Sequence, residues 1–326
     1  MSDPWRIIFR TTGGPEVLER ETFDPGFPGP GQVRVKVSAS GVNFIDTYHR
    51  AGLYPLPLPS GLGTEFAGVV DAVGPDVRGF SLGQHVAARI KRPGSYATHV
   101  ILSADELVRV PAGISDEVAA AVTLKGLTAW MLLEKCRKLE PGQIVLVHSA
   151  AGGVGSLLVP WAKAMGGVVI AHAGSAEKAD RARAAGADHS LSCSFDDLAA
   201  KVCKLTGGHG ADLVLDGVGA ASWAASLGAI ARRGLIVSYG NASGLVPPVA
   251  PLELSRAGSV FLTRPTMFDY TRTPEELAEG CSRLFGLITD GTLSVEIGQR
   301  YPLADVAYAH RALESRKTVG STILIP

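Results

Sequence analysis

The sequence has 326 residues, and a typical domain size of about 150 residues favours two domains. Lys and Arg together number 31 and Asp and Glu together number 31, so the formal net charge is zero. This balance argues against a nucleic-acid groove or a polybasic membrane surface as the main functional surface. Hydrophobic residues make up 46% of the chain and charged residues 19%, which is enough for a packed core and argues against intrinsic disorder.

The sequence predicts neither a targeting segment nor a membrane span. No apolar block of signal-peptide length follows the first residues, and no run of about 18 apolar residues occurs. We therefore expect a soluble, cytoplasmic protein. The histidines form no HExxH motif, and the widely spaced cysteines form no CxxC pair, so we expect neither a disulfide framework nor a metal site. These cysteines are Cys136, Cys193, Cys203 and Cys281.

Short strands interrupted by glycine and proline dominate residues 33–110. Val33, Val35 and Val37 alternate with Arg34 and Lys36, which is the period of a half-buried strand. Further strand candidates lie at residues 66–73, 86–90, 96–101 and 107–110. The pattern predicts a small barrel or meander.

After Ser115, alanine-rich helical stretches alternate with apolar strands, which is typical of βαβ units. Six strand candidates follow in turn, at residues 144–148, 168–173, 187–191, 213–216, 235–239 and 260–262. This count predicts a doubly wound, six-stranded parallel sheet. Pro160 lies within the helix expected after the first of these strands, where the lost backbone donor should kink or divide the helix.

The pattern changes again near Thr263. Thr273, Pro274 and Glu276 form a capping box with proline at the first helical position, and predict a helix that runs to about Asp290. A strand near 300–302, a helix near 304–315 and a strand at 322–325 follow. We assign this tail to the first domain. The expected domains are therefore residues 1–124 with 265–326, and residues 125–264.

The strongest chemical signal is the run VLVHSAAGGVG at Val145–Gly155, which reads as a strand, a glycine-rich turn and a helix. Glycines let the backbone approach a pyrophosphate, and the helix start offers N–H groups and a positive dipole end. The turn opens a six-strand βα array, so it predicts dinucleotide binding.

The region after the next strand indicates which nicotinamide cofactor is bound. An acidic residue about 20 positions after the glycine turn would bind the ribose hydroxyl of NADH, but no acid follows strand 168–173 directly. Ser175 can donate to a phosphate oxygen and Lys178 can place a cation beside it, which favours the 2′-phosphate of NADPH. Glu177 is expected to point elsewhere on the helix. The alternative for Lys178 is a solvated helix charge.

Sequence blocks along essentially the whole chain resemble the zinc-independent quinone oxidoreductase branch, the zeta-crystallin-like branch, of the medium-chain dehydrogenase/reductase superfamily. The blocks are Gly13–Leu18, Gly41–Tyr48, Gly52–Pro55, Gly61–Glu65, Lys125–Thr128, Ala150–Gly155, Gly240–Gly244 and Gly320–Pro326. The resemblance implies an α/β protein with a GroES-like β-rich catalytic domain, built from both ends of the chain. It also implies a central Rossmann domain and a cofactor in the cleft between the two.

In the zinc-dependent alcohol dehydrogenases of this superfamily, cysteine and histidine ligands stand at positions that here resemble Asn43 and Thr64, and a four-cysteine lobe is absent here. The resemblance therefore implies a site without catalytic zinc, poorly equipped to oxidise alcohols. What remains is hydride delivery to an acceptor that is already electrophilic. Quinones and conjugated enones meet this requirement.

The resemblance also implies the site residues. The expected catalytic residues are Asn43, Tyr48 and Tyr54, with a turn-stabilising role as the alternative for Asn43 and a core role as the alternative for Tyr48. The expected cofactor contacts are Asn43, Tyr48, Thr128, Gly152, Gly153, Val154, Gly174, Ser175, Lys178, Cys193, Tyr239, Gly240, Asn241, Leu262, Arg264 and Arg316. Cys193 replaces a tyrosine common in related sequences, which removes a hydroxyl and a stacking surface beside the 2′-phosphate.

Asp46 is expected to form local hydrogen bonds rather than act as a general base.

The leading functional hypothesis is therefore a zinc-free and flavin-free NADPH oxidoreductase that reduces quinones. Two alternatives are an NADPH-dependent reductase of activated alkenes, such as enones or enoyl thioesters, and a nucleotide-binding protein with little turnover. Zero net charge argues against RNA as a partner. A homodimer is expected through the apolar edge strand Ser259–Arg264, because an exposed edge is normally paired or covered.

Overall fold

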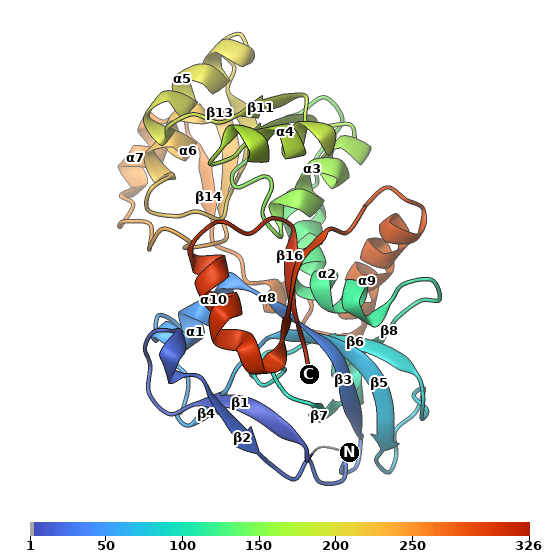
Figure 1. The fold of residues 1–326 in the computed structure, drawn as a ribbon. Helices are drawn as coiled ribbons and strands as arrows, with labels where there is room; N and C mark the ends of the chain where they lie inside the picture. The colour runs from blue at the N-terminus through green and yellow to red at the C-terminus, as the bar shows by residue number, and fades with distance from the viewer. Residues whose placement is uncertain (1–2) are drawn as a thin grey trace. The chain divides into compact units, whose positions relative to one another are not determined.

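Two compact units make up the computed structural model, which describes residues 3–326 (Figure 1). The first unit runs to Leu127 and includes Thr271–Thr289 and Val295–Pro326, and the second comprises Thr128–Tyr270 and Asp290–Ser294. The tail segments that return to the first unit make it discontinuous in sequence. The unit boundaries lie a few residues beyond the expected domain limits at 124 and 264, and the assignment of the two units as domains stays a prediction.

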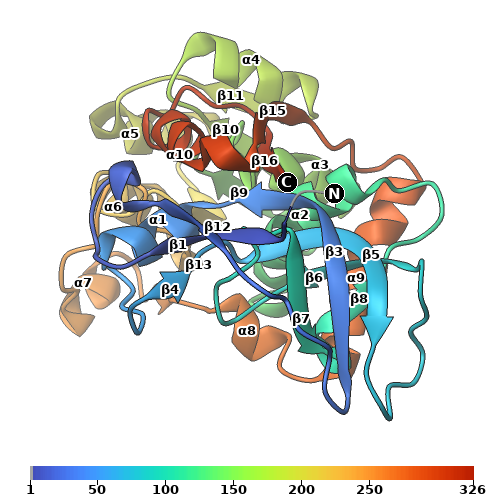
Figure 2. The same cartoon turned by 60° about the horizontal axis from the view of Figure 1, so that its bottom comes forward.

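The first unit is built on β-strands. Within the described residues, its larger sheet has the order β15-β16-β3-β5-β6-β8, with β7 also paired to β3, and a smaller sheet has the order β2-β1-β4. The strands are β1 (Trp5–Phe9), β2 (Glu19–Thr22), β3 (Gln32–Val42), β4 (Ser60–Gly61), β5 (Glu65–Val73), β6 (His85–Arg89), β7 (His99–Ser103), β8 (Leu107–Arg109), β15 (Ile297–Pro302) and β16 (Ser321–Ile325). The long strands β3 and β5 run antiparallel, side by side (Figure 2). The β-rich meander predicted for residues 33–110 is present, and the tail strands extend it.

Helices accompany the strands of this unit. They are α1 (Phe44–Ala51), α2 (Asp116–Trp130), α9 (Pro274–Thr289) and α10 (Val306–Glu314), with single 3-10 turns η1 (Pro15–Val17), η2 (Ala104–Glu106) and η4 (Leu303–Asp305). The predicted capping box opens α9, because Thr273 Oγ1 accepts from the Glu276 backbone N–H and Glu276 accepts from the Thr273 N–H. A continuation of α2 over Met131–Lys135 (η3) is π-helical.

The strand predicted at residues 96–101 is shifted in the structure, because this segment serves two sheets. Tyr96 and Ala97 pair with the smaller sheet, where the Ile7 N–H donates to the Tyr96 carbonyl and Ala97 bridges to Arg6. The following residues His99–Ser103 pair with β3 of the larger sheet. Tyr96 is thereby fixed at the junction of the two sheets, and its side chain is fully buried.

The second unit holds the predicted six-stranded parallel sheet. Its order is β11-β10-β9-β12-β13-β14 and all its strand pairs are parallel. The strands are β9 (Ile144–Val147), β10 (Val168–His172), β11 (His189–Leu191), β12 (Ala211–Asp216), β13 (Ile230–Ser238) and β14 (Phe261–Thr263). The strand order reverses direction between β9 and β12, which is the switch point where doubly wound sheets bind ligands.

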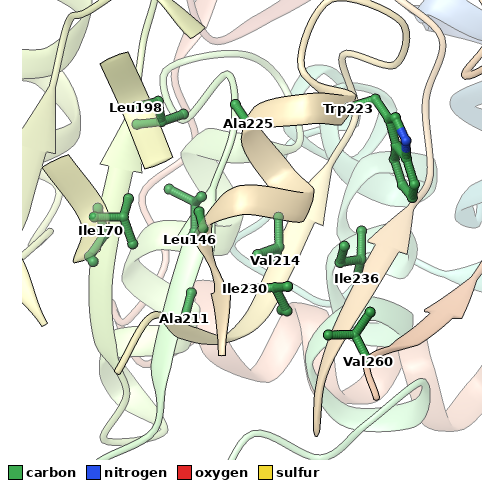
Figure 3. Close-up of a cluster of buried hydrophobic side chains, with 12 residues drawn as sticks. Leu146, Ile170, Leu198, Ala211, Val214, Trp223, Ala225, Ile230, Ile236 and Val260 are labelled. Carbon is green, nitrogen blue, oxygen red and sulfur yellow. The ribbon is translucent and has the colours of Figure 1, made fainter. Parts of the chain in front are cut away.

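The second unit also contains helices, several of which cover this sheet. They are α3 (Gly155–Ala164), α4 (Ala176–Ala184), α5 (Phe195–Leu205), α6 (Trp223–Ala229), α7 (Pro251–Arg256) and α8 (Met267–Tyr270). Figure 3 shows a buried cluster in which the strand side chains of Leu146, Val214 and Ile236 pack beneath residues of α5 and α6. The intervening strand residues, such as Val145 and Leu215, are buried too, as expected of a parallel sheet covered on both faces.

Pro160 does not divide its helix, contrary to that part of the prediction. Helix α3 runs from Gly155 to Ala164 with Pro160 inside it. The residues on either side, Val159 and Trp161, are fully buried. Their packing against the sheet holds the helix together across the missing backbone hydrogen bond.

No helix among residues 3–326 is long and apolar enough to cross a membrane.

Candidate functional site

The glycine turn lies at the carboxyl end of β9, at the switch point of the parallel sheet. Ser149 has a positive φ of 51°, so the chain turns sharply directly after the strand. A Cβ atom at Gly155 would lie 2.7 Å from Cα of Ala150 and closer still to the carbonyl oxygen of Ser149. Only glycine therefore allows α3 to begin this close to the strand end. The predicted pyrophosphate residues Gly152, Gly153 and Val154 lie in this turn.

The start of α3 carries no side-chain cap, since its N-cap residue is Val154. The first N–H groups of a helix have no carbonyl partner within the helix, and they carry the positive end of its dipole. A helix start reached through a glycine turn at a switch point is therefore suited to an anionic group such as a pyrophosphate.

A buried polar network supports this turn from within the second unit. His148, the residue before Ser149, contacts Ser226 Oγ through Nε2 at 2.9 Å. Ser226 donates in turn to Oδ2 of the fully buried Asp216 at 2.6 Å, and Ser222 donates to both Asp216 oxygens. Burial lowers the pKa of His148 to about 4, so its imidazole is neutral at neutral pH. The network fixes the backbone at the point where β9 leads into the glycine turn.

Ser175 and Lys178 lie at the carboxyl end of β10, as predicted. Ser175 is the N-cap of α4, and its Oγ accepts from the Lys178 backbone N–H at 3.3 Å. The hydroxyl hydrogen of Ser175 is not used in this bond and is able to donate to an anion. Glu177 pairs with Arg181 at 3.6 Å, which keeps its carboxylate on the helix surface. The Ser175 hydroxyl thus lies at the N-terminus of α4 and Lys178 belongs to the first turn of the same helix, a combination that suits a phosphate group.

Cys193 lies beyond β11, the strand that pairs with β10. Its carbonyl oxygen accepts from His172 Nε2 at 3.0 Å, and the His172 ring packs against Phe195 at a centroid distance of 5.0 Å. Burial lowers the pKa of His172. The half-buried Cys193 is thus placed beside the end of β10 by its backbone.

The remaining predicted contacts of the second unit follow β13 and β14. The ring of Tyr239 packs against Gly217, where a Cβ atom would lie only 2.8 Å from Cζ of Tyr239. Arg264 Nη1 donates to the carbonyls of Ser238, at 2.8 Å, and Gly240, at 3.2 Å. Asn241 is buried, and Leu262 in β14 is half-buried. These residues line the carboxyl ends of the same parallel sheet, so the fold brings them to the edge that also carries the glycine turn. Thr128 lies on α2, at the start of the second unit.

The predicted catalytic residues belong to the first unit and lie together on and beside α1. Asn43 is the N-cap residue of α1, and its Nδ2 donates to Glu65 Oε1 at 2.8 Å. The rings of Tyr48 and Tyr54 meet edge to face at a centroid distance of 5.4 Å. Nδ1 of His49 lies 3.0 Å from the Tyr54 carbonyl oxygen and ties the segment after the helix back to it. Arg316, the last predicted contact, follows α10 with a positive φ of 60° and is exposed.

Sequence reasoning missed the ion pair behind Asn43. Glu65 Oε1 accepts from Lys125 Nζ at 2.7 Å and Glu65 Oε2 accepts from the Leu124 N–H at 2.7 Å. The side chain of Glu65 occupies the space above Gly41, its partner in the β3–β5 pairing, where a Cβ atom would collide with it. Both residues lie in sequence blocks that were singled out, Gly61–Glu65 and Lys125–Thr128. Nothing in those blocks indicates that Glu65 and Lys125 contact each other.

Asp46 makes the local hydrogen bonds expected of it. Its Oδ2 accepts from the Asn43 N–H at 2.8 Å and from Tyr96 Oη at 2.9 Å, and its Oδ1 accepts from Thr64 Oγ1 at 2.9 Å. Tyr96 also contacts His310 Nε2, at 3.3 Å. A histidine distant in sequence is therefore brought close to Asp46 by the fold.

Asn43 and Thr64, which stand where the resemblance places zinc ligands, do not fit a catalytic zinc ion. Zinc is ordinarily bound by Cys, His, Asp or Glu, whereas these positions carry a neutral amide that donates to Glu65 and a neutral hydroxyl that donates to Asp46. No group of three or more His, Cys, Asp or Glu side chains among residues 3–326 is arranged to hold a metal.

Two family models match the chain. A model described as "Alcohol dehydrogenase GroES-like domain" matches residues 29–112, and one described as "Zinc-binding dehydrogenase" matches residues 153–282. The first match confirms the expected GroES-like fold for the β-rich part of the chain.

Individual relatives extend over nearly the full length. A quinone oxidoreductase of Pseudomonas aeruginosa is 48% identical over 322 residues, which cover 98% of this chain and 99% of that protein. A 2-haloacrylate reductase of Burkholderia sp is 40% identical over 327 residues, which cover 98% of each chain. The solved structure of Escherichia coli quinone oxidoreductase complexed with NADPH is 44% identical, with a TM-score of 0.96, and the match covers 99% of this chain and 100% of that one.

Proposed function

This chain belongs to the quinone oxidoreductase branch of the medium-chain dehydrogenase/reductase superfamily, and we propose that it reduces quinones with NADPH, without zinc or flavin. One observation carries the proposal. The glycine turn at the end of β9 and the Ser175 cap with Lys178 at the end of β10 lie on adjacent strands of one sheet. One accommodates a pyrophosphate and the other a 2′-phosphate, so together they select NADPH.

Residues of the second unit would hold the cofactor. Gly152, Gly153 and Val154 would face the pyrophosphate, and Gly174, Ser175 and Lys178 the 2′-phosphate, with Cys193 beside it. The block Tyr239–Asn241, with Leu262, Arg264 and Thr128, would line the nicotinamide side. From the first unit, Asn43, Tyr48 and Arg316 would complete the contacts. When bound, NADPH supplies the hydride for the reduction.

The protein's own residues then position the acceptor and stabilise charge on it. An acceptor oxygen gains negative charge as hydride arrives, and a hydrogen-bond donor at that oxygen lowers the barrier. Tyr48 and Tyr54 carry hydroxyl donors, and the edge-to-face contact of their rings holds both in place. Asn43 is held by Glu65 through one of its amide hydrogens. These three residues are the proposed catalytic groups.

The test is NADPH oxidation by the purified protein with a panel of quinones, with NADH as the comparison cofactor. We expect turnover with quinones and a preference for NADPH. Turnover with none of the quinones, despite NADPH binding, would overturn the proposal.

A second candidate activity is reduction of activated alkenes, which the 40% identity to a 2-haloacrylate reductase favours. The same cofactor site serves it equally well, so only the acceptor distinguishes the two. Enones and haloacrylates in the same panel decide between them. NADPH binding without turnover on any acceptor would instead support a nucleotide-binding protein with little turnover.

We also propose a homodimer formed through residues 259–264. Strand β14 is an edge of the six-stranded sheet, and Phe261 on it is 60% exposed. Two such edges paired about a twofold axis would cover both. Light scattering should give a dimer mass that Phe261→Asp reduces to the monomer, whereas Leu82→Asp, at an exposed apolar residue outside β14, should not. The expected cytoplasmic location is likewise a proposal, to be tested by cell fractionation.

A further inference from the structure

A chain of hydrogen bonds crosses the first unit from a partly exposed carboxylate to the N-terminus of α1. Glu314, at the end of α10, has a side chain that is 36% exposed and accepts from Arg50 Nη2 at 2.5 Å. Arg50 is buried on α1, and its Nη1 lies 3.0 Å from His310 Nδ1. His310 Nε2 lies 3.3 Å from Tyr96 Oη, which lies 2.9 Å from Asp46 Oδ2. His310, Tyr96 and Asp46 are all fully buried.

The direction of each bond follows from the arginine. A guanidinium has only donors, so Nδ1 of His310 must accept from Arg50. The hydrogen of the neutral imidazole is then on Nε2 and is donated to Tyr96 Oη. Tyr96 in turn donates its own hydrogen to Asp46. Burial and the charge of Arg50 lower the pKa of His310 to about 3, which keeps the imidazole in this neutral form.

Asp46 is the hydrogen-bond acceptor at the inner end of this series of hydrogen bonds. Besides Tyr96, the Asn43 N–H donates to Oδ2 and Thr64 donates to Oδ1. Burial raises the pKa of Asp46 most strongly, the three hydrogen bonds lower it, and the charge of Glu65 raises it slightly. The balance places the pKa of Asp46 at about 7.

We propose that His310 and Tyr96 are positioning residues that act through ionised Asp46 to hold the start of α1, and with it Asn43, in the geometry that the reduction requires. The inference rests on the proposed function and adds to it residues remote from the site. An ionised carboxylate has acceptor sites for all three donors. Protonation turns one carboxyl oxygen of Asp46 into a donor that faces neighbouring donors. The hydrogen bond from the Asn43 N–H to Asp46 is then weaker.

A glycine makes room for Tyr96 in this chain of hydrogen bonds. Gly63, with φ of 91°, precedes Thr64, and a Cβ atom there would lie 2.7 Å from Cε1 of Tyr96. The Tyr96 backbone N–H also donates to the Leu62 carbonyl at 2.9 Å. The tyrosine is thus held on both sides, and its hydroxyl has little freedom to leave Asp46.

The pH dependence of turnover tests the proposal. For the wild type we expect kcat to fall as the pH is lowered through about 7, because Asp46 becomes protonated. Tyr96→Phe removes one donor to the carboxylate, which favours the protonated form, so this limb should move about one pH unit higher. Tyr308→Phe is the matched control, since Tyr308 lies on α10 near His310 but is 63% exposed. Its pH profile should equal that of the wild type.

A pair of variants at His310 distinguishes positioning from mere packing. Gln can accept from Arg50 and donate to Tyr96, so His310→Gln should keep kcat within about threefold of the wild type. His310→Leu removes both contacts and should lower kcat about tenfold or more. Equal loss in both variants, or a Tyr96→Phe profile that matches the wild type, would overturn the proposal.

Hydrogen exchange supplies a readout that needs no turnover. After correction for the intrinsic pH dependence, protection of the Asn43 amide should fall as the pH is lowered through about 7, and at higher pH in Tyr96→Phe. Absence of quinone turnover together with this exchange pattern would mean that the proposed function fails while the hydrogen-bonded chain still controls Asn43. Exchange at Asn43 that does not change with pH would refute the control by Asp46, whatever the activity.

Discussion

Lys125 Nζ lies 2.7 Å from Glu65 Oε1 in the interior of the first unit, where 4% of Lys125 and none of Glu65 is exposed. Asn43 donates to the same carboxylate oxygen. The pair thus compensates two buried charges and orients a proposed catalytic amide.

Lys125→Met leaves the Glu65 carboxylate buried without its counter-charge, so we expect a loss of about 3–5 kcal/mol in the free energy of unfolding. Urea denaturation measures it. Glu65→Gln combined with Lys125→Met should recover part of the loss, because neither charge then remains. Arg300→Met is the control. Arg300, on β15, forms an exposed ion pair at 2.8 Å with Glu117, which lies on α2 like Lys125. This variant should lower the free energy of unfolding by less than about 1 kcal/mol. Equal losses at both lysine and arginine positions would contradict this assignment.

The cap of α4 can be tested against the cap of α5. Ser194 caps α5 by accepting from the Asp197 N–H, as Ser175 caps α4. Each change to Ala should lower stability by about 1 kcal/mol. Only Ser175→Ala should also weaken NADPH binding, by about tenfold in calorimetry, and it should leave NADH binding unchanged. An equal effect on both cofactors would place the 2′-phosphate elsewhere.

Removing the Lys178 charge should have a similar selective effect. We expect Lys178→Gln to weaken NADPH binding about tenfold and to reduce its salt dependence, because a cation beside a phosphate is lost. Arg183→Gln on the same helix removes a charge whose recorded partner is Asp180 and should change neither. If both variants bound NADPH equally well, the alternative interpretation of Lys178 as a solvated helix charge would hold.

Gly155→Ala should disrupt the glycine turn, because the new Cβ atom would overlap the backbone of Ser149 and Ala150. We expect NADPH binding to fall by more than about tenfold. Gly286→Ala in α9 is the control. A Cβ atom at Gly286 meets no atom within 4 Å, so this variant should bind normally and gain about 0.5–1 kcal/mol of stability. Normal NADPH binding by Gly155→Ala would show that the close helix approach is not needed.

Buried His148 should make the protein less stable in acid. Its pKa of about 4 in the folded chain lies below the ordinary value of 6.5, so the unfolded chain binds the proton more readily between these values. Stability is therefore lost as the pH falls from 6.5 to 4, at up to about 1.4 kcal/mol per pH unit for one group. His148→Gln does not titrate and should show a flatter dependence in urea denaturation. Parallel curves for variant and wild type would mean that His148 does not titrate in this range.

Local patterns alone predicted much of this protein. The alternation of strands and helices between 144 and 262, the capping box at Thr273 and the glycine turn each depend on residues close in sequence, and the structure contains all three. Backbone hydrogen bonds and helix caps join residues a few positions apart. The residue types therefore carry that information without the tertiary fold.

Tertiary structure decided the rest of the candidate site. Arg50 and His310 are separated by 260 positions, and Glu65 and Lys125 by 60 positions. No periodicity or spacing predicts such contacts, because they depend on how distant strands and helices pack. The link from Asp46 through Tyr96 to His310 could not be predicted for this reason, since His310 comes from the far end of the chain. A buried charge or imidazole acquires its pKa and its partners only when the fold removes water and places the donors around it.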